Sequence, residues 1–151
     1  MEYRHTQKGT VIIISLVFGI VLTILISISS IGQIHALPIP ILLMVDVILF
    51  VSLALFYSLT VELKAATLIC YFGIGLIRKS ILLSEIQNVQ SVKNPWYVGW
   101  GIRWMPGQYW LWNISGFSAV ELTLKNGSRI RLGTDEPEKL VQAILSMKAI
   151  D

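Results

Sequence analysis

The sequence predicts an α+β protein in which an N-terminal two-helix transmembrane hairpin is followed by a compact, mostly β domain. Three observations favour this fold class. Of the 151 residues, 54% are hydrophobic and 14% are charged, whereas an ordinary soluble domain has about 25% charged residues. No Asp, Glu, Lys or Arg occurs between Lys8 and Asp46, or between Asp46 and Glu62. From about residue 60 onward, long apolar runs give way to short alternating segments, which are typical of strands.

Two apolar runs predict membrane-spanning helices over residues 9–31 and 38–59. At 1.5 Å per residue, each run is long enough to cross a hydrocarbon core of about 30 Å. A cleaved signal peptide is the competing interpretation of the first run. That run is too long for the apolar region of a signal peptide, and no small-residue cleavage site is followed by soluble sequence.

Five basic side chains flank the two runs on their outer sides: Arg4, Lys8, Lys64, Arg78 and Lys79. The connection between the runs carries no Lys or Arg, so the positive-inside bias places both termini in the cytoplasm. We therefore predict a multi-pass protein of the cell membrane, integral to the lipid bilayer. Its parts are a cytoplasmic N-terminal segment at 1–8, the hairpin at 9–59 and a cytoplasmic domain at 60–151.

Small and weakly polar residues recur at every fourth position of the first helix: Ser15, Gly19, Thr23 and Ser27. Such a stripe allows two helix backbones to approach closely in lipid, so we expect it to pack on the second helix. Folding the hairpin about residues 34 and 35 places Asp46 at the level of Thr23, which offers the carboxyl group a hydroxyl partner. Asp46 is then either a helix–helix hydrogen-bonding residue, or a proton or ion site or a contact to another transmembrane protein.

Short apolar segments at 60–63, 68–72, 76–83 and 86–92, separated by glycines and polar residues, suit antiparallel strands. The first begins where the second helix ends, so almost no linker separates the domain from the membrane. The single cysteine, Cys70, excludes an intramolecular disulfide bond. Its apolar neighbours predict a buried, unreactive thiol.

The clearest hairpin lies shortly before the C-terminus. A three-residue loop at 125–127, with its glycine in the left-handed conformation, would place Leu122 opposite Ile130 on the core face. The same register sets Glu121 opposite Arg131 on the solvent face, where the two charges attract.

An amphipathic helix is predicted after this hairpin. Asp135 is a suitable cap and Pro137 fits the first turn. One face of the predicted helix is apolar: Leu140, Ala143, Ile144 and Met147. The outline is therefore an antiparallel sheet of about seven strands closed by one C-terminal helix.

Several short motifs follow one another through the β region: Gly99-Trp100-Gly101-Ile102-Arg103, Pro106-Gly107, Trp112-Asn113-Ile114-Ser115-Gly116, Ala119-Val120-Glu121-Leu122 and Leu132-Gly133-Thr134-Asp135-Glu136-Pro137. In this order they resemble the bacterial membrane-anchored proteins with a pleckstrin-homology-like (PH-like) domain. The resemblance covers residues 60–148, and the helical hairpin in front matches the usual layout of that family. It implies a seven-stranded, partly open barrel capped by the C-terminal helix. It implies neither an activity nor ligand residues, and phosphoinositide binding would be inferred from the fold alone.

The sequence offers little for catalysis. Its two histidines, His5 and His35, lie outside the predicted domain, which leaves no histidine there for a triad or a zinc site. Phosphate-binding loops and nucleophile elbows are also missing from the sequence. We therefore expect no enzyme activity, cofactor or metal, and a net charge of +3 without a basic run predicts no nucleic-acid binding.

The segment 96–112 is the most unusual part of the chain, because it contains all five tryptophans. Seven of its residues are candidate membrane or partner contacts: Trp96, Tyr97, Trp100, Arg103, Trp104, Tyr109 and Trp110. Three environments suit such a set, namely the domain core, the lipid headgroup layer and the surface of a protein partner.

The leading functional interpretation is a non-enzymatic scaffold or regulatory module that contacts another protein, or a second copy of this chain, at the inner leaflet. The alternative is a domain that senses anionic lipid through Arg103 and its aromatic neighbours. A small membrane enzyme is the third interpretation, and it would require acidic residues such as Glu85 and Asp135 to converge in a pocket.

Overall fold

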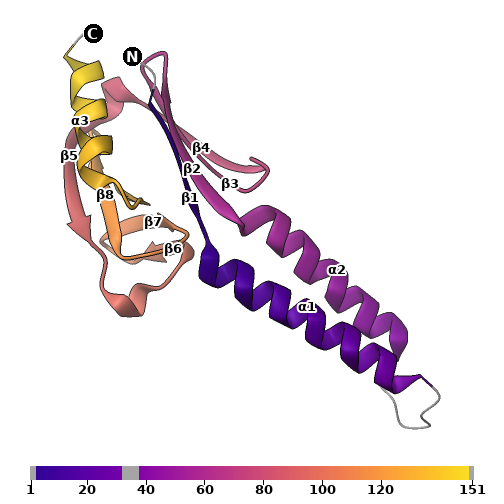
Figure 1. Ribbon diagram of the computed structural model, residues 1–151. Coiled ribbons are helices and arrows are strands. Elements are labelled where there is room, and N and C mark those ends of the chain that lie inside the picture. Colours follow the sequence, from indigo (N-terminus) through magenta and orange to yellow (C-terminus); the bar gives the residue numbers. More distant parts are fainter. Residues whose placement is uncertain (1–2, 32–37, 150–151) are drawn as a thin grey trace.

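The computed structural model describes residues 3–31 and 38–149 (Figure 1). It is an α+β structure in which two N-terminal helices are followed by a sheet-rich region. His35 and the predicted reversal of the hairpin at residues 34 and 35 lie outside the described residues.

The two helices, α1 (Thr10–Ser30) and α2 (Ile39–Phe56), lie side by side and project together from the sheets (Figure 1). Both are long and apolar enough to cross a membrane, and few of their residues are buried within the chain. A helix that belonged to a globular core would be mostly buried, so these two helices do not form such a core.

A four-stranded antiparallel sheet has the order β1-β2-β3-β4. Its strands are β1 (Tyr3–Lys8), β2 (Ser58–Lys64), β3 (Thr67–Phe72) and β4 (Ile77–Leu82). The last three match the predicted segments. Strand β1 was not predicted, because residues 1–8 were assigned to a segment outside the domain. This stretch is polar, and its strand conformation depends on pairing with β2, more than fifty residues away along the chain.

The helices and this sheet are joined at two adjacent points. Strand β1 leads into α1 through Gly9, and α2 leads into β2 through Tyr57. The Gly9 N–H donates a hydrogen bond to the Tyr57 carbonyl at 2.9 Å, and Lys8 pairs with Ser58 in the sheet. The predicted lack of a linker is confirmed, and the connection is in fact double.

The second sheet has five strands in the order β5-β8-β9-β7-β6. They are β5 (Ile86–Lys93), β6 (Gly101–Met105), β7 (Tyr109–Asn113), β8 (Ser118–Leu124) and β9 (Arg129–Gly133). Short 3₁₀ turns, η1 (Leu83–Glu85) and η2 (Trp96–Val98), precede β5 and β6. Strands β7 and β9 are parallel, whereas the other pairs are antiparallel.

The expected total of about seven strands is not confirmed, because the described chain has eight strands after α2 in addition to β1. The expectation of an antiparallel sheet is wrong for β7 and β9, which are parallel. Strands β6 and β7 arise in the aromatic segment, where bulky residues on both faces hide the alternation on which strand prediction depends. The β8–β9 register was predicted correctly, since Leu122 faces Ile130 and Glu121 faces Arg131.

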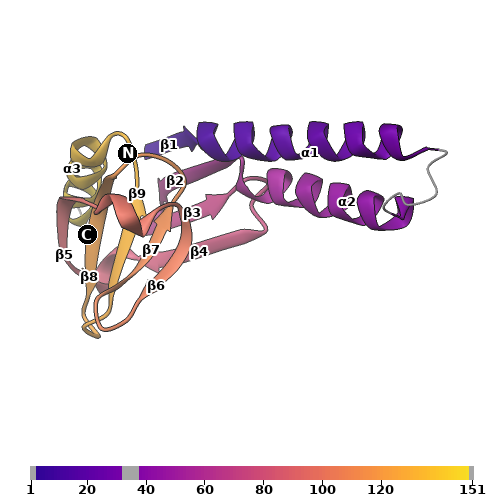
Figure 2. The same ribbon diagram turned by 90° about the horizontal axis from the view of Figure 1, so that it is seen from below.

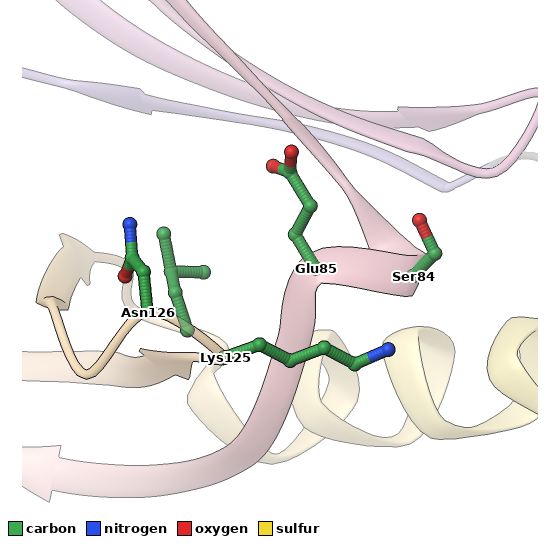
Figure 3. A pocket seen from close by; sticks show the side chains of 5 residues that line it. Ser84, Glu85, Lys125 and Asn126 are labelled. Atoms are coloured by element: carbon green, nitrogen blue, oxygen red, sulfur yellow. The ribbon is translucent and has the colours of Figure 1, made fainter.

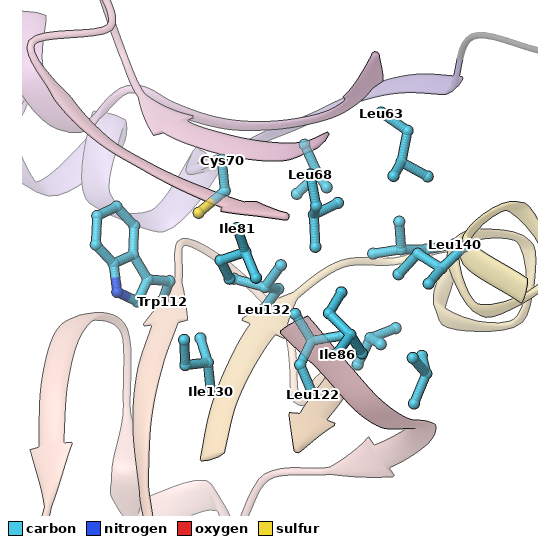
Figure 4. Packing of buried hydrophobic residues seen from close by; sticks show 14 of the residues in the cluster. Leu63, Leu68, Cys70, Ile81, Ile86, Trp112, Leu122, Ile130, Leu132 and Leu140 are labelled. Atoms are coloured by element: carbon cyan, nitrogen blue, oxygen red, sulfur yellow. The ribbon is translucent and has the colours of Figure 1, made fainter. Parts of the chain in front are cut away.

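The core lies between the two sheets and α3 (Pro137–Lys148), which packs on β5 and β8 (Figure 4). Both sheets and the helix contribute fully buried side chains, among them Leu68, Leu122, Leu132 and Leu140. The predicted apolar face of α3 is confirmed, because Leu140 and Ile144 are buried while Ala143 and Met147 pack against the cluster.

The predicted capping role of Asp135 is wrong. Glu136 occupies the N-cap position of α3, and no side chain caps the helix by a hydrogen bond. The Asp135 carboxylate instead lies 2.5 Å from His5 Nε2 on β1. This contact ties the first strand of the chain to the start of its last helix, a long-range partner that local sequence does not reveal.

Candidate contact surface

The aromatic segment forms a hairpin that is inserted in the sequence between β5 and β8. These two strands are neighbours in the sheet, and residues 94–117 connect them. Within this connection, β7 pairs with β9 and β6 becomes the edge strand. The inserted hairpin therefore widens the three strands β5-β8-β9 to a sheet of five.

Part of the aromatic segment is buried in two separate clusters. The Trp112 ring belongs to the main core and stacks on Phe72 with 5.5 Å between ring centroids. On the opposite face of the sheet, Tyr109 and Leu111 pack with Val98 from η2. Tyr109 was a candidate contact residue, but it is only 3% exposed and packs in this second cluster, although it is among the residues that line the hollow beside Trp104.

The second cluster covers a buried ion pair. Arg131 Nε donates to the Glu121 carboxylate at 2.6 Å, and the guanidinium lies 3.6 Å from the centre of the Tyr109 ring. Arg131 Nη1 also donates to Asn94 Oδ1 at 3.1 Å, and Gln90 Nε2 donates to Glu121 Oε1 at 3.0 Å. The expectation that this pair faces solvent is therefore wrong, because the inserted segment folds over that face.

Two tryptophans form an exposed pair on the inserted hairpin. Trp104 on β6 and Trp110 on β7 face each other across the strands, with 5.0 Å between ring centroids. Trp104 is 52% exposed, and both rings line a shallow hollow that also includes Gly107 and Arg129. An exposed pair of large aromatic rings on an edge strand and its neighbour is unusual for an isolated domain, and it marks this edge as a candidate contact surface.

Arg103 is the middle residue of the edge strand β6, and Trp100 directly precedes that strand. Arg103 is exposed, and its Nε donates to the Trp100 carbonyl at 3.2 Å. Trp100 is half-buried, and its indole N–H donates to the Gly116 carbonyl at 3.3 Å. Arg103 therefore presents a positive charge on the edge strand, on the face opposite to Trp104, whereas the Trp100 indole joins two loops.

Trp96 and Tyr97 lie in η2 and are the most exposed of the candidate residues. Trp96 is 80% exposed, and its ring meets Tyr97 edge-on with 6.1 Å between centroids. Neither side chain belongs to the second cluster, to which η2 contributes only Val98. Of the seven candidates, Trp96, Tyr97, Arg103, Trp104 and Trp110 are exposed.

The structure brings Thr23 and Asp46 together, as the sequence predicted. The Thr23 hydroxyl donates to the Asp46 carboxylate, and it also lies within hydrogen-bonding distance of the Gly19 and Ile20 carbonyls. Gly19 lies close to Leu49 of α2, but Ser15 is exposed. The small-residue stripe therefore packs on α2 only from its second member onward.

The acidic residues that an enzyme would need do not converge. Glu85 lines a shallow pocket beside the β8–β9 turn, together with Ser84, Leu124, Lys125 and Asn126 (Figure 3). Lys125 is held there by its backbone N–H, which donates to the Glu85 carbonyl at 2.8 Å. Asp135 does not line this pocket and contacts His5 instead. Among the described residues, no three His, Cys, Asp or Glu side chains form a metal-binding group.

Cys70 is buried between the sheets, as predicted. Burial raises the pKa of its thiol to about 12, so the thiol is protonated and a poor nucleophile at neutral pH.

Sequence reasoning missed three exposed apolar residues: Ile74, Leu76 and Phe117. Each lies in a loop, where a single apolar residue carries no periodic signal. The position of Ile74 beside the end of α2 could be found only from the pairing of β3 with β2 and of β4 with β3.

Comparison with known proteins gives no match, either to a protein-family model or to a curated protein.

Proposed function

We propose that this protein is a non-enzymatic, membrane-anchored scaffold whose sheet domain presents strand β6 to a protein partner at the cytoplasmic face of the membrane. One observation carries the proposal, namely the exposed pair formed by Trp104 on edge strand β6 and Trp110 on the neighbouring strand β7, in a domain that two direct connections fix to the helices. A flexible tether would let the domain search for partners, whereas this connection holds its edge in one orientation.

Membrane insertion and orientation rest on the helices and on the charges at their ends. Both helices are long and apolar enough to cross a membrane, and their side chains are largely uncovered by the rest of the chain. Lys8 is separated from α1 only by Gly9, and Arg78 lies near the end of β4 that adjoins the helices. Basic residues at this end favour the cytoplasmic side.

A PH-like fold for the domain is supported by the strands that remain when the inserted hairpin is set aside. These are the four strands of the first sheet together with β5, β8 and β9, all antiparallel and closed by α3. In this interpretation, the hairpin of β6 and β7 is an addition to the fold. The β6–β7 hairpin carries exposed candidate contact residues, so we assign the proposed function to this hairpin and not to the PH-like fold.

The partner is expected to bind as an extended segment. Strand β6 has a paired neighbour on one side only, so its outer N–H and C=O groups can pair with an added strand. Tryptophan and arginine are the residue types that contribute most to binding energy in protein interfaces. Trp104 and Arg103 therefore suit a segment with an apolar side chain and an acidic side chain at neighbouring positions.

The test is photo-crosslinking in cells that produce the full-length chain. A photoreactive amino acid at position 104 should give a discrete crosslinked protein, and the product should be lost when Trp110→Ala is added. Gln87 is the matched control position, because it is exposed on β5, the opposite edge strand of the same sheet. A product containing two copies of this chain would identify the partner as a second copy. Equal crosslinking at positions 104 and 87, or insensitivity to Trp110→Ala, would contradict the proposal.

A further inference from the structure

We propose that five exposed apolar side chains around the base of the helices form a lipid-contacting rim that enters the headgroup layer of the bilayer: Ile74, Leu76, Trp96, Tyr97 and Phe117. This inference rests on the membrane anchoring proposed above. It adds that one end of the domain enters the headgroup layer, so that the domain is in direct contact with lipid.

One half of the rim is the turn between β3 and β4. The Gly73 N–H donates to the Ser58 carbonyl at 2.9 Å, and the Ile74 N–H lies 3.4 Å from the Ala54 carbonyl inside the last turn of α2. In Figure 2 this turn extends past the sheet and lies alongside α2. Ile74 and Leu76 are nevertheless 62% and 74% exposed. These side chains are therefore at the level where α2 leaves the lipid.

The other half of the rim lies beside the start of α1. The Ile114 side chain contacts Gly9, the residue before α1, so closely that a Cβ atom on Gly9 would be 2.7 Å from it. The Gln7 side-chain amide donates to the Ser115 carbonyl at 3.3 Å. The loop from β7 to β8 is thereby held against the β1–α1 junction. Phe117, which follows in that loop, is exposed.

The turn η2 is joined to this loop and completes the rim. The Asn94 N–H donates to the Phe117 carbonyl at 2.7 Å, and the Trp100 indole N–H bonds the Gly116 carbonyl. These two bonds lie on either side of η2, so the turn that carries the exposed Trp96 and Tyr97 is held beside the β7–β8 loop at the β1–α1 junction. In Figure 1 the segment between β5 and β6 lies toward the helices, whereas the C-terminal end of α3 lies at the opposite end of the molecule.

Two cations lie beside the rim. Lys8 pairs with Ser58 at the end of the four-stranded sheet near the helices. Arg78 lines a hollow together with Ile74 and Glu62. A cation beside an exposed apolar side chain is the combination that anionic headgroups and the acyl boundary accept together. Tryptophan and tyrosine concentrate in this layer in membrane proteins.

The rim is separate from the proposed partner edge. Trp104 and Trp110 share their hollow with residues of the β8–β9 turn, and in Figure 2 that turn lies at the lower left, away from the helices. Lipid contact and partner contact therefore use different aromatic residues. The rim fixes the tilt of the domain, and the tilt determines where the β6 edge points.

The experiment measures depth in the full-length chain, reconstituted in nanodiscs of phosphatidylcholine and phosphatidylglycerol. In a Cys70→Ala background, a single cysteine at position 74, 96 or 117 carries a bimane fluorophore, and lipids spin-labelled in the headgroup or deep in the acyl chain act as quenchers. Two reference positions are exposed in the structure: Gln142 on α3, remote from the helices, and Met44 within α2.

We expect the headgroup spin label to quench fluorescence at positions 74, 96 and 117. The deep label should quench fluorescence at position 44, and neither label should quench it at position 142. Rim positions that behave as Gln142 does, while Met44 is quenched, would overturn the rim and leave the anchored scaffold intact. Failure to quench Met44 would overturn both proposals. Quenching of the rim in nanodiscs of phosphatidylcholine alone would assign the contact to apolar insertion, whereas a requirement for phosphatidylglycerol would assign it to the neighbouring cations; either result supports the rim.

Discussion

Gly73 lies directly against the backbone carbonyl of Ala54, so the turn between β3 and β4 is in contact with the last turn of α2. A Cβ atom on Gly73 would also be 2.6 Å from the Leu55 carbonyl oxygen. Gly73 has a φ of +46°, a conformation that L-residues with side chains adopt at a cost. The contact requires glycine for two independent reasons, one of space and one of backbone conformation.

The first prediction concerns Gly73→Ala. Left-handed backbone costs about 1–2 kcal/mol for an L-residue, and the clash with a backbone carbonyl adds about 1–3 kcal/mol because neither main chain can move freely. We expect a loss of about 3 kcal/mol in the free energy of unfolding, measured by denaturant titration in detergent micelles.

Gly107→Ala is the matched control for this prediction. Gly107 also has a positive φ, +69°, but no atom lies within 4 Å of the point that a Cβ atom on it would occupy. Only the conformational cost of about 1 kcal/mol should remain. Equal losses in the two variants would mean that the close approach to α2 contributes nothing.

The second prediction concerns the buried Glu121–Arg131 pair. Glu121→Ala leaves the Arg131 guanidinium without its carboxylate beneath Tyr109, and losing one partner of a buried pair costs about 3–5 kcal/mol. Replacing both residues, Glu121→Leu with Arg131→Met, should cost less than Glu121→Ala alone, because no buried charge is left unpaired.

The measurement is thermal unfolding of the wild type, Glu121→Ala and the double variant, with Lys139→Ala as the control. Lys139 pairs with Glu136 at an exposed position, where an ion pair contributes about 0–1 kcal/mol. A double variant that is less stable than Glu121→Ala would contradict the interpretation that the unpaired charge causes the loss.

Features that depend on neighbouring residues were predictable from sequence. The two helices are visible as apolar runs, and the register of β8 with β9 follows from their alternation and from a loop ending in Gly127, whose φ is +82°. The apolar face of α3 repeats with helical spacing. In each case the signal and the structure lie within the same short segment.

Features that depend on distant residues were not predictable. The polar sequence of β1 becomes a strand only because β2 offers it an edge. In the candidate contact surface, Tyr109 and Trp110 are adjacent in sequence, yet Tyr109 is buried and Trp110 is exposed. Tyr109 is buried because Val98 of η2 and Arg131 of β9 contact its ring, and the local sequence pattern carries no signal for either contact.

The third prediction is a gain in stability at the turn between β2 and β3. Ala65 and Ala66 form this two-residue turn, with φ values of +46° and +56°. Both positions require the left-handed region, which Asn-Gly occupies more readily than Ala-Ala. We expect Ala65→Asn with Ala66→Gly to stabilise the chain by about 1 kcal/mol.

A rise in the denaturant midpoint with an unchanged slope would bear out this prediction. The reverse change at the β8–β9 loop, Gly127→Ala, should lower the midpoint through backbone conformation alone, since Gly127 has a positive φ and a Cβ atom there would have no neighbour within 4 Å. An unchanged midpoint for the Asn-Gly variant would show that the alanine turn is not strained.

The fourth prediction is a loss of stability at alkaline pH. Burial raises the pKa of the Cys70 thiol from 9.0 to about 12. Above pH 9 the unfolded chain releases the thiol proton while the folded chain retains it, so the free energy of unfolding falls as the pH rises from 9 to 12. Cys70→Ala should make this decline shallower, as measured by urea unfolding at several pH values.

Tyr3 contributes in an overlapping window. Burial, followed by the nearby Glu136 and Asp135 carboxylates, raises the pKa of its hydroxyl from 10.0 to about 12. Tyr3→Phe should therefore flatten the decline further between pH 10 and 12, and its effect should add to that of Cys70→Ala. If the pH dependence of wild type and both variants is parallel, these two groups are not its source.

The fifth prediction concerns Asp46 in α2. Its carboxylate accepts a hydrogen bond from Thr23, and hydrogen bonds between helices in a membrane contribute about 1–2 kcal/mol. A carboxylate at the centre of a membrane helix costs about 3 kcal/mol on insertion scales. Asp46→Leu removes the hydrogen bond to Thr23 but also removes the cost of placing a carboxylate in the membrane. We therefore expect the variant to be expressed, extracted from membranes by detergent and folded as the wild type is.

Ser52→Leu is the control for Asp46→Leu, because Ser52 is on the same helix and bonds to the Ile48 carbonyl one turn earlier. Both variants should retain the crosslink expected from position 104. Loss of that product in Asp46→Leu alone would mean that the carboxyl group acts outside the hairpin, as a contact to another transmembrane protein.

The Thr23 hydroxyl keeps a hydrogen-bond acceptor in either variant, since it can donate to the Gly19 or Ile20 carbonyl of its own helix. Any functional loss would therefore be assigned to Asp46 and not to an unpaired Thr23.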